Sequence, residues 1–194
     1  MIQGAVLVFA YLLGSIPTAL IMSKRFSGVD IRTLGDGNMG ARNTSRTLGA
    51  KLGIVVAVVD FLKGVLAVLL ANLLGLALIW QILAGICAIL GHDFPVFAKF
   101  KGGQGLATSL GTMLVLFPTQ MLLGSILYGI LFLTTKKSSI SAGFGGGLMA
   151  LLLGIWQEWI LLAYAIVIFL FIPLKQFIDS HRRKEIEAAK AKEV

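Results

Sequence analysis

Several residue types that build catalytic or structural centres are scarce in this chain of 194 residues. It has one cysteine, Cys87, so it has no internal disulfide framework. It has two histidines without a dense group of carboxylates or thiols beside them, which argues against a zinc site. It lacks the Gly-x-Ser-x-Gly element of serine hydrolases. The turn Lys101-Gly102-Gly103 lacks the P-loop spacing, so binding of a nucleotide triphosphate is not implied.

The composition instead indicates a membrane protein. Apolar residues make up 57% of the chain, whereas about 45–50% is usual in soluble domains. The net charge of +8 comes without the aromatic-basic pattern or any module of a nucleic-acid-binding protein, so nucleic acid is not an expected partner. Lys and Arg held on the cytoplasmic side of a polytopic protein explain the charge better.

Hydrophobic runs predict an all-α integral membrane protein with seven transmembrane helices. A helix needs roughly 20 residues to cross a hydrocarbon core of about 30 Å, and the fourth and fifth runs fall short of that length. The expected spans are residues 2–23, 52–71, 77–98, 105–118, 119–135, 138–155 and 159–177.

The positions of the cations predict the orientation of these spans. Sixteen of the seventeen Lys and Arg residues lie in four polar segments, 24–51, 99–104, 136–137 and the part from 175 onward. Seven spans place all four segments on one side, which the positive-inside rule makes cytoplasmic. The N-terminus is then outside and the C-terminus cytoplasmic. We expect one membrane-embedded domain, 1–194, in which 178–194 is a basic cytoplasmic tail facing anionic lipid headgroups.

The segment 24–51 combines three features of an anion-binding surface. Glycines let backbone N–H groups turn toward a bound phosphate, arginines provide forked donors, and asparagines donate without adding charge. A solvated loop on the positive side would explain the arginines but not the many Gly and Asn residues among them. The residues concerned are Gly35, Gly37, Gly40, Arg32, Arg42, Arg46, Asn38 and Asn43.

A second candidate anion site precedes the expected fourth span. Lys101, Gly102 and Gly103 lead directly into that helix, whose free N–H groups and positive dipole end favour a phosphate. A glycine-rich interfacial turn is the alternative. Lys101 alone does not decide between them, but together with the segment 24–51 it favours the site.

Four further polar residues are candidates for supporting roles. Asp60 and Lys63 lie within an expected span, and their i,i+3 spacing permits an ion pair. That pair is either structural or a support for the loop arginines. His92 is expected to be a hydrogen-bonded residue at the interface, with a role as a base as the alternative. Ser15 lies at the end of the first span.

These residues resemble the bacterial integral-membrane acyl-phosphate:glycerol-3-phosphate acyltransferase family. The likeness covers residues 10–111 and is specific there, whereas from residue 112 onward it is mostly topological. The matching motifs are Gly14-Ser15-Ile16-Pro17, Asp30-Ile31-Arg32 with Gly35 to Arg46, Asp60-x-x-Lys63-Gly64, and Gly91-His92 through Gly111.

The resemblance implies a function for the whole chain. It implies transfer of a fatty acyl group from acyl-phosphate to the 1-hydroxyl of glycerol 3-phosphate, in the bacterial inner membrane, at a site facing the cytoplasm and without metal or other cofactor. It implies phosphate contacts from Arg32, Arg46, Lys101, Gly102 and Gly103, and contacts of Asn38 and Asn43 with glycerol or carbonyl oxygens. Arg42 is a candidate phosphate contact from the chemistry of its own side chain and not from the resemblance. Ser139 and His181 are the candidate catalytic residues for orienting the hydroxyl or handling its proton.

Several positions depart from the family pattern. Asp36 stands where a serine is usual, Arg42 replaces a threonine and Gln104 replaces a lysine. Lys136 replaces the first of two serines in a later element, of which only the second, Ser139, is kept. The terminal element, 181–186, lacks its asparagine. These changes leave open a non-catalytic or transporter-like paralogue that binds glycerol phosphate. A CDP-alcohol phosphotransferase is the less favoured rival, because it needs more metal-binding aspartates and a different spacing.

Overall fold

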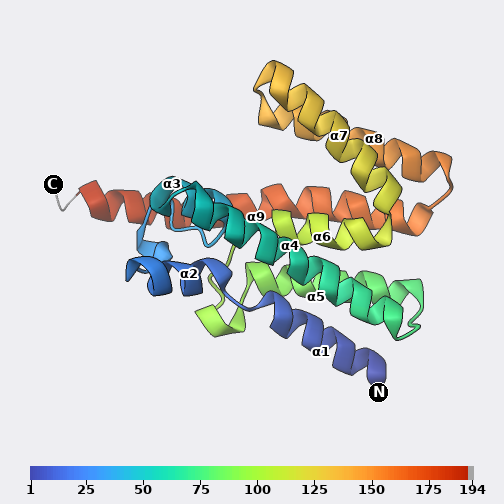
Figure 1. Ribbon diagram of the computed structural model, residues 1–194, viewed down its shortest axis with the longest axis horizontal. Coiled ribbons are helices and arrows are strands. Elements are labelled where there is room, and N and C mark those ends of the chain that lie inside the picture. Colours follow the sequence, from blue (N-terminus) through green and yellow to red (C-terminus); the bar gives the residue numbers. More distant parts are fainter. Residues whose placement is uncertain (192–194) are drawn as a thin grey trace. The chain divides into compact units, whose positions relative to one another are not determined.

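The computed structural model describes the backbone of residues 1–191 and the side chains of residues 1–180, and its regular elements are all helical (Figure 1). His181, a candidate catalytic residue, therefore lies outside the described side chains. The elements are α1 (Ile2–Gly14), α2 (Thr18–Ser27), η1 (Ile31–Thr33), α3 (Ala41–Leu48), α4 (Ala50–Leu73), α5 (Leu78–Asp93), η2 (Val96–Ala98), α6 (Leu106–Leu116), α7 (Pro118–Thr135), α8 (Ser138–Ile155) and α9 (Trp159–Ala191).

Six described segments are long and apolar enough to cross a membrane, which confirms an all-helical integral membrane fold. The expected fourth span corresponds to α6, an apolar helix of only 11 residues. The first span is not one helix, because α1 ends at Gly14 and α2 begins at Thr18. Pro17, which lacks an N–H, lies in this break. The count of seven spans and the sides of the two termini stay predictions.

The chain divides into two compact units. The first comprises residues 1–112 and the chain from residue 172 onward, and the second comprises residues 113–171. α9 therefore contributes its N-terminal part to the second unit and its C-terminal part to the first.

In the first unit, α1, α4 and α5 pack against one another around a core of small residues. Glycines bring the helix backbones together, as is common in membrane proteins. A Cβ at Gly91 would collide with the carbonyl oxygen of Tyr11 and lie 2.9 Å from the backbone nitrogen of Ser15. On the other side of the unit, a Cβ at Gly64 of α4 would lie 2.9 Å from the backbone nitrogen of Thr112 in α6.

In the second unit, α7 packs along α8. A Cβ at Gly124 or Gly145 would lie 2.6 Å from the other residue's carbonyl oxygen. Gly124 and Gly145 thus let the backbones of α7 and α8 approach each other closely. Large apolar side chains on α8 and α9 point outward in this unit, among them Phe144 and Leu170, as expected of surfaces that face lipid.

Candidate active site

A buried polar network fixes the break between α1 and α2. The ammonium group of Lys63 donates to the carbonyl oxygen of Ile16 at 2.5 Å, to Thr18 Oγ1 at 2.6 Å and to Asp60 Oδ1 at 2.8 Å. Thr18 in turn donates to Asp60 Oδ1 at 2.9 Å. Asp60 and Lys63 are only 2% and 3% exposed, so all three Lys63 donors are used inside the protein. The predicted ion pair on α4 is confirmed.

His92, near the C-terminal end of α5, lies between this network and the turn before α6. Its Nδ1 is 3.6 Å from Asp60 Oδ1, and its carbonyl oxygen accepts the N–H of Gly103 at 3.1 Å. The Gly103 N–H is therefore already engaged. A Cβ at Gly102 would collide with the carbonyl oxygen of His92 and lie 2.5 Å from that of Asp93, so glycine is needed there for a close approach of two backbones. A Cβ at Gly103 would instead collide with the imidazole ring of His92.

The loop before α3 is shaped by Asn43. Its amide nitrogen donates to the carbonyl oxygens of Leu34 and Asn38, both at 3.0 Å, and its Oδ1 accepts the N–H of Asp36 at 3.3 Å. Asn43 is 2% exposed. Since its donors and its acceptor are engaged, Asn43 holds the loop rather than presenting a free amide to a ligand. Gly35 has a φ of 57°, a conformation that favours glycine.

The three arginines expected at the phosphate site differ in what they contact. Arg32 forms a two-point pair with the carboxylate of Asp30, with Nη2 to Oδ2 at 2.6 Å and Nε to Oδ1 at 2.9 Å. The hydrogen bond from Arg32 lowers the pKa of Asp30, and the same bond raises the pKa of Arg32. Arg42 and Arg46 are exposed on α3, and neither forms an ion pair with any acidic side chain that the structure describes.

A cavity of about 300 Å³ opens beside these elements in the first unit. This volume is at the small end of the range for ligand pockets. One part of its lining is polar and another part is apolar, so it can hold a charged head and the start of a hydrocarbon chain. The polar residues are Asn38, Arg42, Asp60, His92, Gln104 and Gln176, and the apolar side chains are Ala41, Ala57, Leu106, Ala107 and Leu110.

Asn38 lines this cavity and carries a side-chain donor that is unpaired within the described part of the chain. It is 8% exposed, and its side-chain nitrogen has no hydrogen-bond partner among the described atoms. A buried donor without a partner is costly, and an oxygen of a bound molecule would satisfy it.

The C-terminal part of α9 reaches the same cavity through Gln176. Its neighbour Lys175 is buried, pairs with Asp179 at 2.6 Å, and lies 5.0 Å above the ring of Phe94. The backbone oxygen of Phe94 accepts the hydroxyl of Tyr11 at 2.8 Å. The contact of Lys175 with Phe94 joins α9 to the end of α5, and the bond from Tyr11 joins α1 to the same place.

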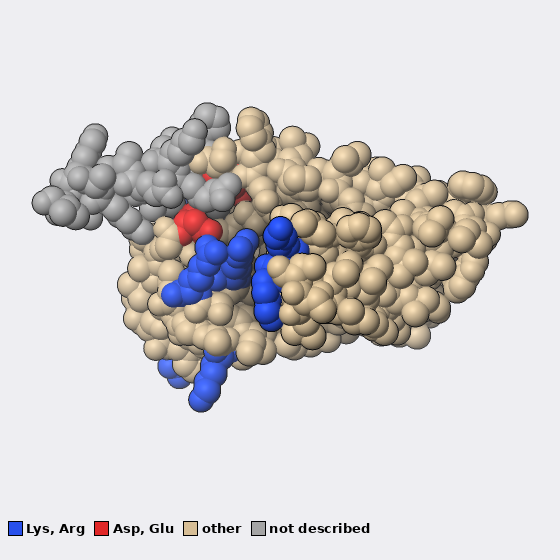
Figure 2. Space-filling model, turned by 90° about the horizontal axis from the view of Figure 1, so that it is seen from above, with Lys and Arg blue, Asp and Glu red and all other residues tan. Residues whose placement is uncertain are grey.

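The other predicted residues are more dispersed. Lys101 and Arg46 are exposed and do not line the cavity, although the Lys and Arg side chains on one face gather in one region (Figure 2). Ser15 is fully buried, and its hydroxyl has no partner among the described atoms. Ser139 is exposed on α8 and belongs to the second unit, whereas the residues that line the cavity belong to the first.

Sequence reasoning missed Thr18 and Gln176. Thr18 directly follows Pro17, and a hydroxyl beside this proline was a usable signal for a partner to Asp60. Gln176 carried no signal, because only the path of α9 brings it to the cavity. Among the described residues, no group of three or more His, Cys, Asp or Glu side chains could hold a metal ion.

Comparison with known proteins gives one consistent result. The sequence profile of the family described as Glycerol-3-phosphate acyltransferase matches residues 4–184. The chain is 42% identical over 166 residues to "Glycerol-3-phosphate acyltransferase 2" of Bacillus anthracis, which covers 86% of this chain and 87% of that protein. It is 52% identical over 123 residues to a glycerol-3-phosphate acyltransferase of Geobacter metallireducens, covering 63% of each chain.

Two solved structures share the fold. A crystal structure of PlsY (YgiH), described as an integral membrane glycerol 3-phosphate acyltransferase in its glycerol 3-phosphate form, aligns with a TM-score of 0.81 at 34% identity, over 94% of this chain and 92% of that one. The lysophosphatidic acid form of PlsY aligns with a TM-score of 0.79 at 33% identity, over 94% and 91%.

Proposed function

This chain belongs to the glycerol-3-phosphate acyltransferase family, and we propose that it transfers a fatty acyl group from acyl-phosphate to the 1-hydroxyl of glycerol 3-phosphate. The products are lysophosphatidic acid and phosphate. The observation that carries the proposal is the cavity of the first unit, in which Arg42 and Asn38 face the same space as the apolar wall of Ala57 and Leu110. Such a lining suits a phosphorylated head joined to an acyl chain.

The reaction needs little from the protein beyond placement and charge. The hydroxyl oxygen of glycerol 3-phosphate forms a bond to the acyl carbonyl carbon, and the bond from that carbon to the phosphate oxygen breaks. The leaving phosphate takes the bonding electron pair and accepts the hydroxyl proton. Because acyl-phosphate is a mixed anhydride, orientation of the two reactants and neutralisation of their charge supply the catalysis.

The cations divide into two groups in this proposal. Arg42 contacts a phosphate within the cavity, and the side-chain nitrogen of Asn38 donates to a glycerol or carbonyl oxygen. Arg46 and Lys101 have no acidic partner among the described residues and are free to reach a phosphate from exposed positions. Arg32 is the weakest candidate, since Asp30 already engages it. Ser139 and His181 stay proposed candidates for orienting the hydroxyl.

The four basic segments support an orientation. We infer that the cavity faces the cytoplasm of a bacterial cell, in the inner membrane, with the N-terminus outside. α6, the short helix at the place of the expected fourth span, would then also cross the membrane and bring the number of spans to seven. The boundary between the two units falls within this helix.

Turnover by the purified protein tests the proposal. Incubated with palmitoyl-phosphate and labelled glycerol 3-phosphate, it is expected to form labelled lysophosphatidate, with one phosphate released for each acyl group transferred. Binding of glycerol 3-phosphate without any product would contradict the proposal and favour a non-catalytic paralogue. Uptake of glycerol 3-phosphate into proteoliposomes without acyl transfer would favour a transporter.

Removal of a free cation is expected to cost more activity than removal of a paired one. We expect Arg46→Ala and Lys101→Ala each to lower kcat/KM for acyl transfer at least about tenfold, because a charge-assisted contact contributes roughly 1.4 kcal/mol or more. Arg32→Ala is expected to cost less, because Asp30 engages this side chain. Lys24→Ala, at the end of α2, is the control for a general loss of positive charge. Equal losses in all four variants would contradict the assignment.

A further inference from the structure

We propose that His92, held by Asp60, is a positioning residue that sets the Gly102–Gly103 turn beside the cavity. The inference rests on the proposed function, because it concerns how this site holds a phosphorylated reactant. It assigns His92 an effect through the turn and not a bond-making step of its own.

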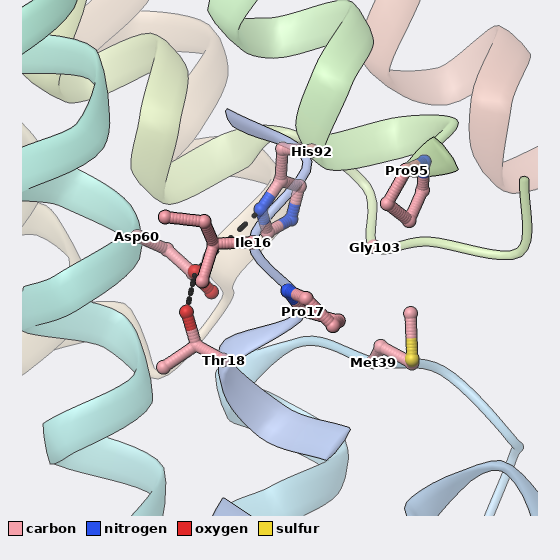
Figure 3. A pocket seen from close by; sticks show the side chains of 8 residues that line it. All are labelled: Ile16, Pro17, Thr18, Met39, Asp60, His92, Pro95 and Gly103. Carbon is pink, nitrogen blue, oxygen red and sulfur yellow. Dashed lines mark hydrogen bonds and ion pairs between the residues drawn. The ribbon is translucent and has the colours of Figure 1, made fainter. Parts of the chain in front are cut away.

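The ring of His92 lies between two partners. Its Nδ1 side faces Asp60 Oδ1 at 3.6 Å, and its Nε2 occupies the space that a Cβ at Gly103 would need. Figure 3 shows the three residues around one small space, with Asp60 contacting Thr18 on one side and His92 on the other. That space has a volume of about 10 Å³, which is close to the minimum for one water molecule.

Asp60 gives the ring a fixed support. Its Oδ1 is held by the ammonium group of Lys63 and by the hydroxyl of Thr18, at 2.8 and 2.9 Å. Its backbone oxygen accepts the hydroxyl of Thr108, in the first turn of α6, at 3.0 Å. The same residue therefore ties together the α1–α2 break, α4 and the beginning of α6. The network therefore fixes the position of a side chain that contacts Asp60, as His92 does.

The segment that leads into the turn is held by its own backbone: the N–H of Phe100 donates to the carbonyl oxygen of Pro95 at 2.9 Å, and the N–H of Lys101 donates to that of Ala98 at 3.3 Å. Lys99 and Phe100 have φ angles of 56° and 58°, which are unfavourable for residues with a side chain. Such conformations persist when the surroundings hold them in place. The Gly102–Gly103 turn that follows is held from outside by His92, whose ring limits Gly103 from one side and whose carbonyl oxygen accepts its N–H at 3.1 Å.

The position of the turn decides where the start of α6 points. The first N–H groups of a helix have no partner within it, and they attract phosphate. Gln104, Gly105, Leu106 and Ala107 all line the 300 Å³ cavity. A shift of the Gly102–Gly103 turn would move these groups relative to a bound phosphate. His92 thus acts on phosphate binding through the backbone that follows it.

Two substitutions separate the two sides of the ring. His92→Asn keeps a donor near the Nδ1 position, toward Asp60, and loses the part that limits Gly103. His92→Gln keeps a polar group near the Nε2 position and loses the support from Asp60. In each variant, we expect the KM for one phosphorylated substrate to rise at least about fivefold relative to wild type. The KM for the other substrate should change less than about twofold. The thermal unfolding midpoint of the detergent-purified protein should stay within about 3 °C of wild type.

A double substitution makes the test specific to the contact. Gly103→Ala places a methyl group against the ring, and its loss of kcat/KM is expected to reach at least about tenfold. His92→Asn shortens the side chain and makes room, so the double variant should lose less than the product of the two single losses. Multiplicative losses would overturn the inference. So would unchanged KM values in both His92 variants, or a fall in kcat alone together with a lowered unfolding midpoint.

Phosphate binding separates this inference from the proposed function. If wild-type protein gives no lysophosphatidate, the proposed reaction fails, and binding of inorganic phosphate followed by ³¹P NMR then decides the role of His92. The inference expects at least about fivefold weaker binding in His92→Asn than in wild type. Equal affinity in the two proteins would overturn it.

Discussion

Replacement of Lys63 by methionine is expected to prevent the first unit from folding stably. Lys63→Met removes a buried cation that donates to Asp60, Thr18 and the backbone of Ile16. The carboxylate of Asp60 would stay buried without its main counter-charge. Loss of one partner of a buried pair costs about 3–5 kcal/mol, which is a large share of a typical stability of about 5–15 kcal/mol. Thermal unfolding and size-exclusion chromatography in detergent measure the outcome.

Two further variants show whether charge is the cause. Lys51→Met changes an exposed lysine near the start of the same helix and is expected to leave the unfolding midpoint unchanged. Asp60→Asn combined with Lys63→Met removes both charges and should recover part of the stability, since no unpaired ion is then buried. A Lys63→Met protein as stable as wild type would show that the network does not hold the α1–α2 break.

Replacement of Gly91 by leucine is expected to have a comparably severe effect, through shape and not through charge. Gly91 lies where α5 meets α1, and even a Cβ there would collide with the carbonyl oxygen of Tyr11. Backbone atoms cannot move aside as a flexible side chain can, so the two helices must separate. Overpacking of a tight contact costs about 1–3 kcal/mol or more. We expect little monodisperse protein and no acyl transfer from Gly91→Leu.

Gly4 provides the matched control on the same helix pair. It lies on α1, and nothing occupies the space within 4 Å of its would-be Cβ. Gly4→Leu should therefore leave folding intact or improve it slightly, because Gly4 is exposed and leucine favours a helix over glycine by about 0.5–1 kcal/mol. Equal damage from the substitutions at Gly4 and Gly91 would contradict a role for close backbone contact.

Part of this fold was predictable because the membrane restricts the possibilities. Apolar runs of about 20 residues predict helices, and the i,i+3 spacing of Asp60 and Lys63 predicts a pair on one face. The break at Pro17 was not predicted, because hydropathy does not report where a helix bends. The shortness of α6 was visible in the sequence, but the boundary between the two units that falls within it was not.

The candidate site was predictable in its chemistry and less so in its geometry. Arg42 and Asn38 line the cavity, and their role in binding an anion stays a prediction. Asn43 belongs to the same loop, yet its amide is engaged by backbone oxygens, which no sequence pattern distinguishes from a ligand contact. The N–H of Gly103 was expected to bind phosphate, whereas it donates to the carbonyl oxygen of His92. These distinctions arise from contacts between segments far apart in the chain.

One departure from the family pattern has a local explanation in the structure. Asp36 uses its carboxylate to accept the N–H of Asn38 at 3.1 Å, and its own N–H donates to Asn43. A side chain with an acceptor at this position therefore closes the loop, whether it is a serine or an aspartate. Gln104 differs, because it lines the cavity and brings an amide where the family usually has a lysine.

Substrate protection of a cysteine placed in the cavity tests the central claim most directly. In a Cys87→Ala background, Ala57→Cys introduces a thiol into the cavity wall, and Ser27→Cys introduces an exposed thiol at the end of α2. Saturating glycerol 3-phosphate together with palmitoyl-phosphate is expected to slow maleimide labelling at position 57 at least about fivefold and to leave position 27 unaffected. Labelling at position 57 that proceeds at the same rate with and without both substrates would contradict binding in this cavity.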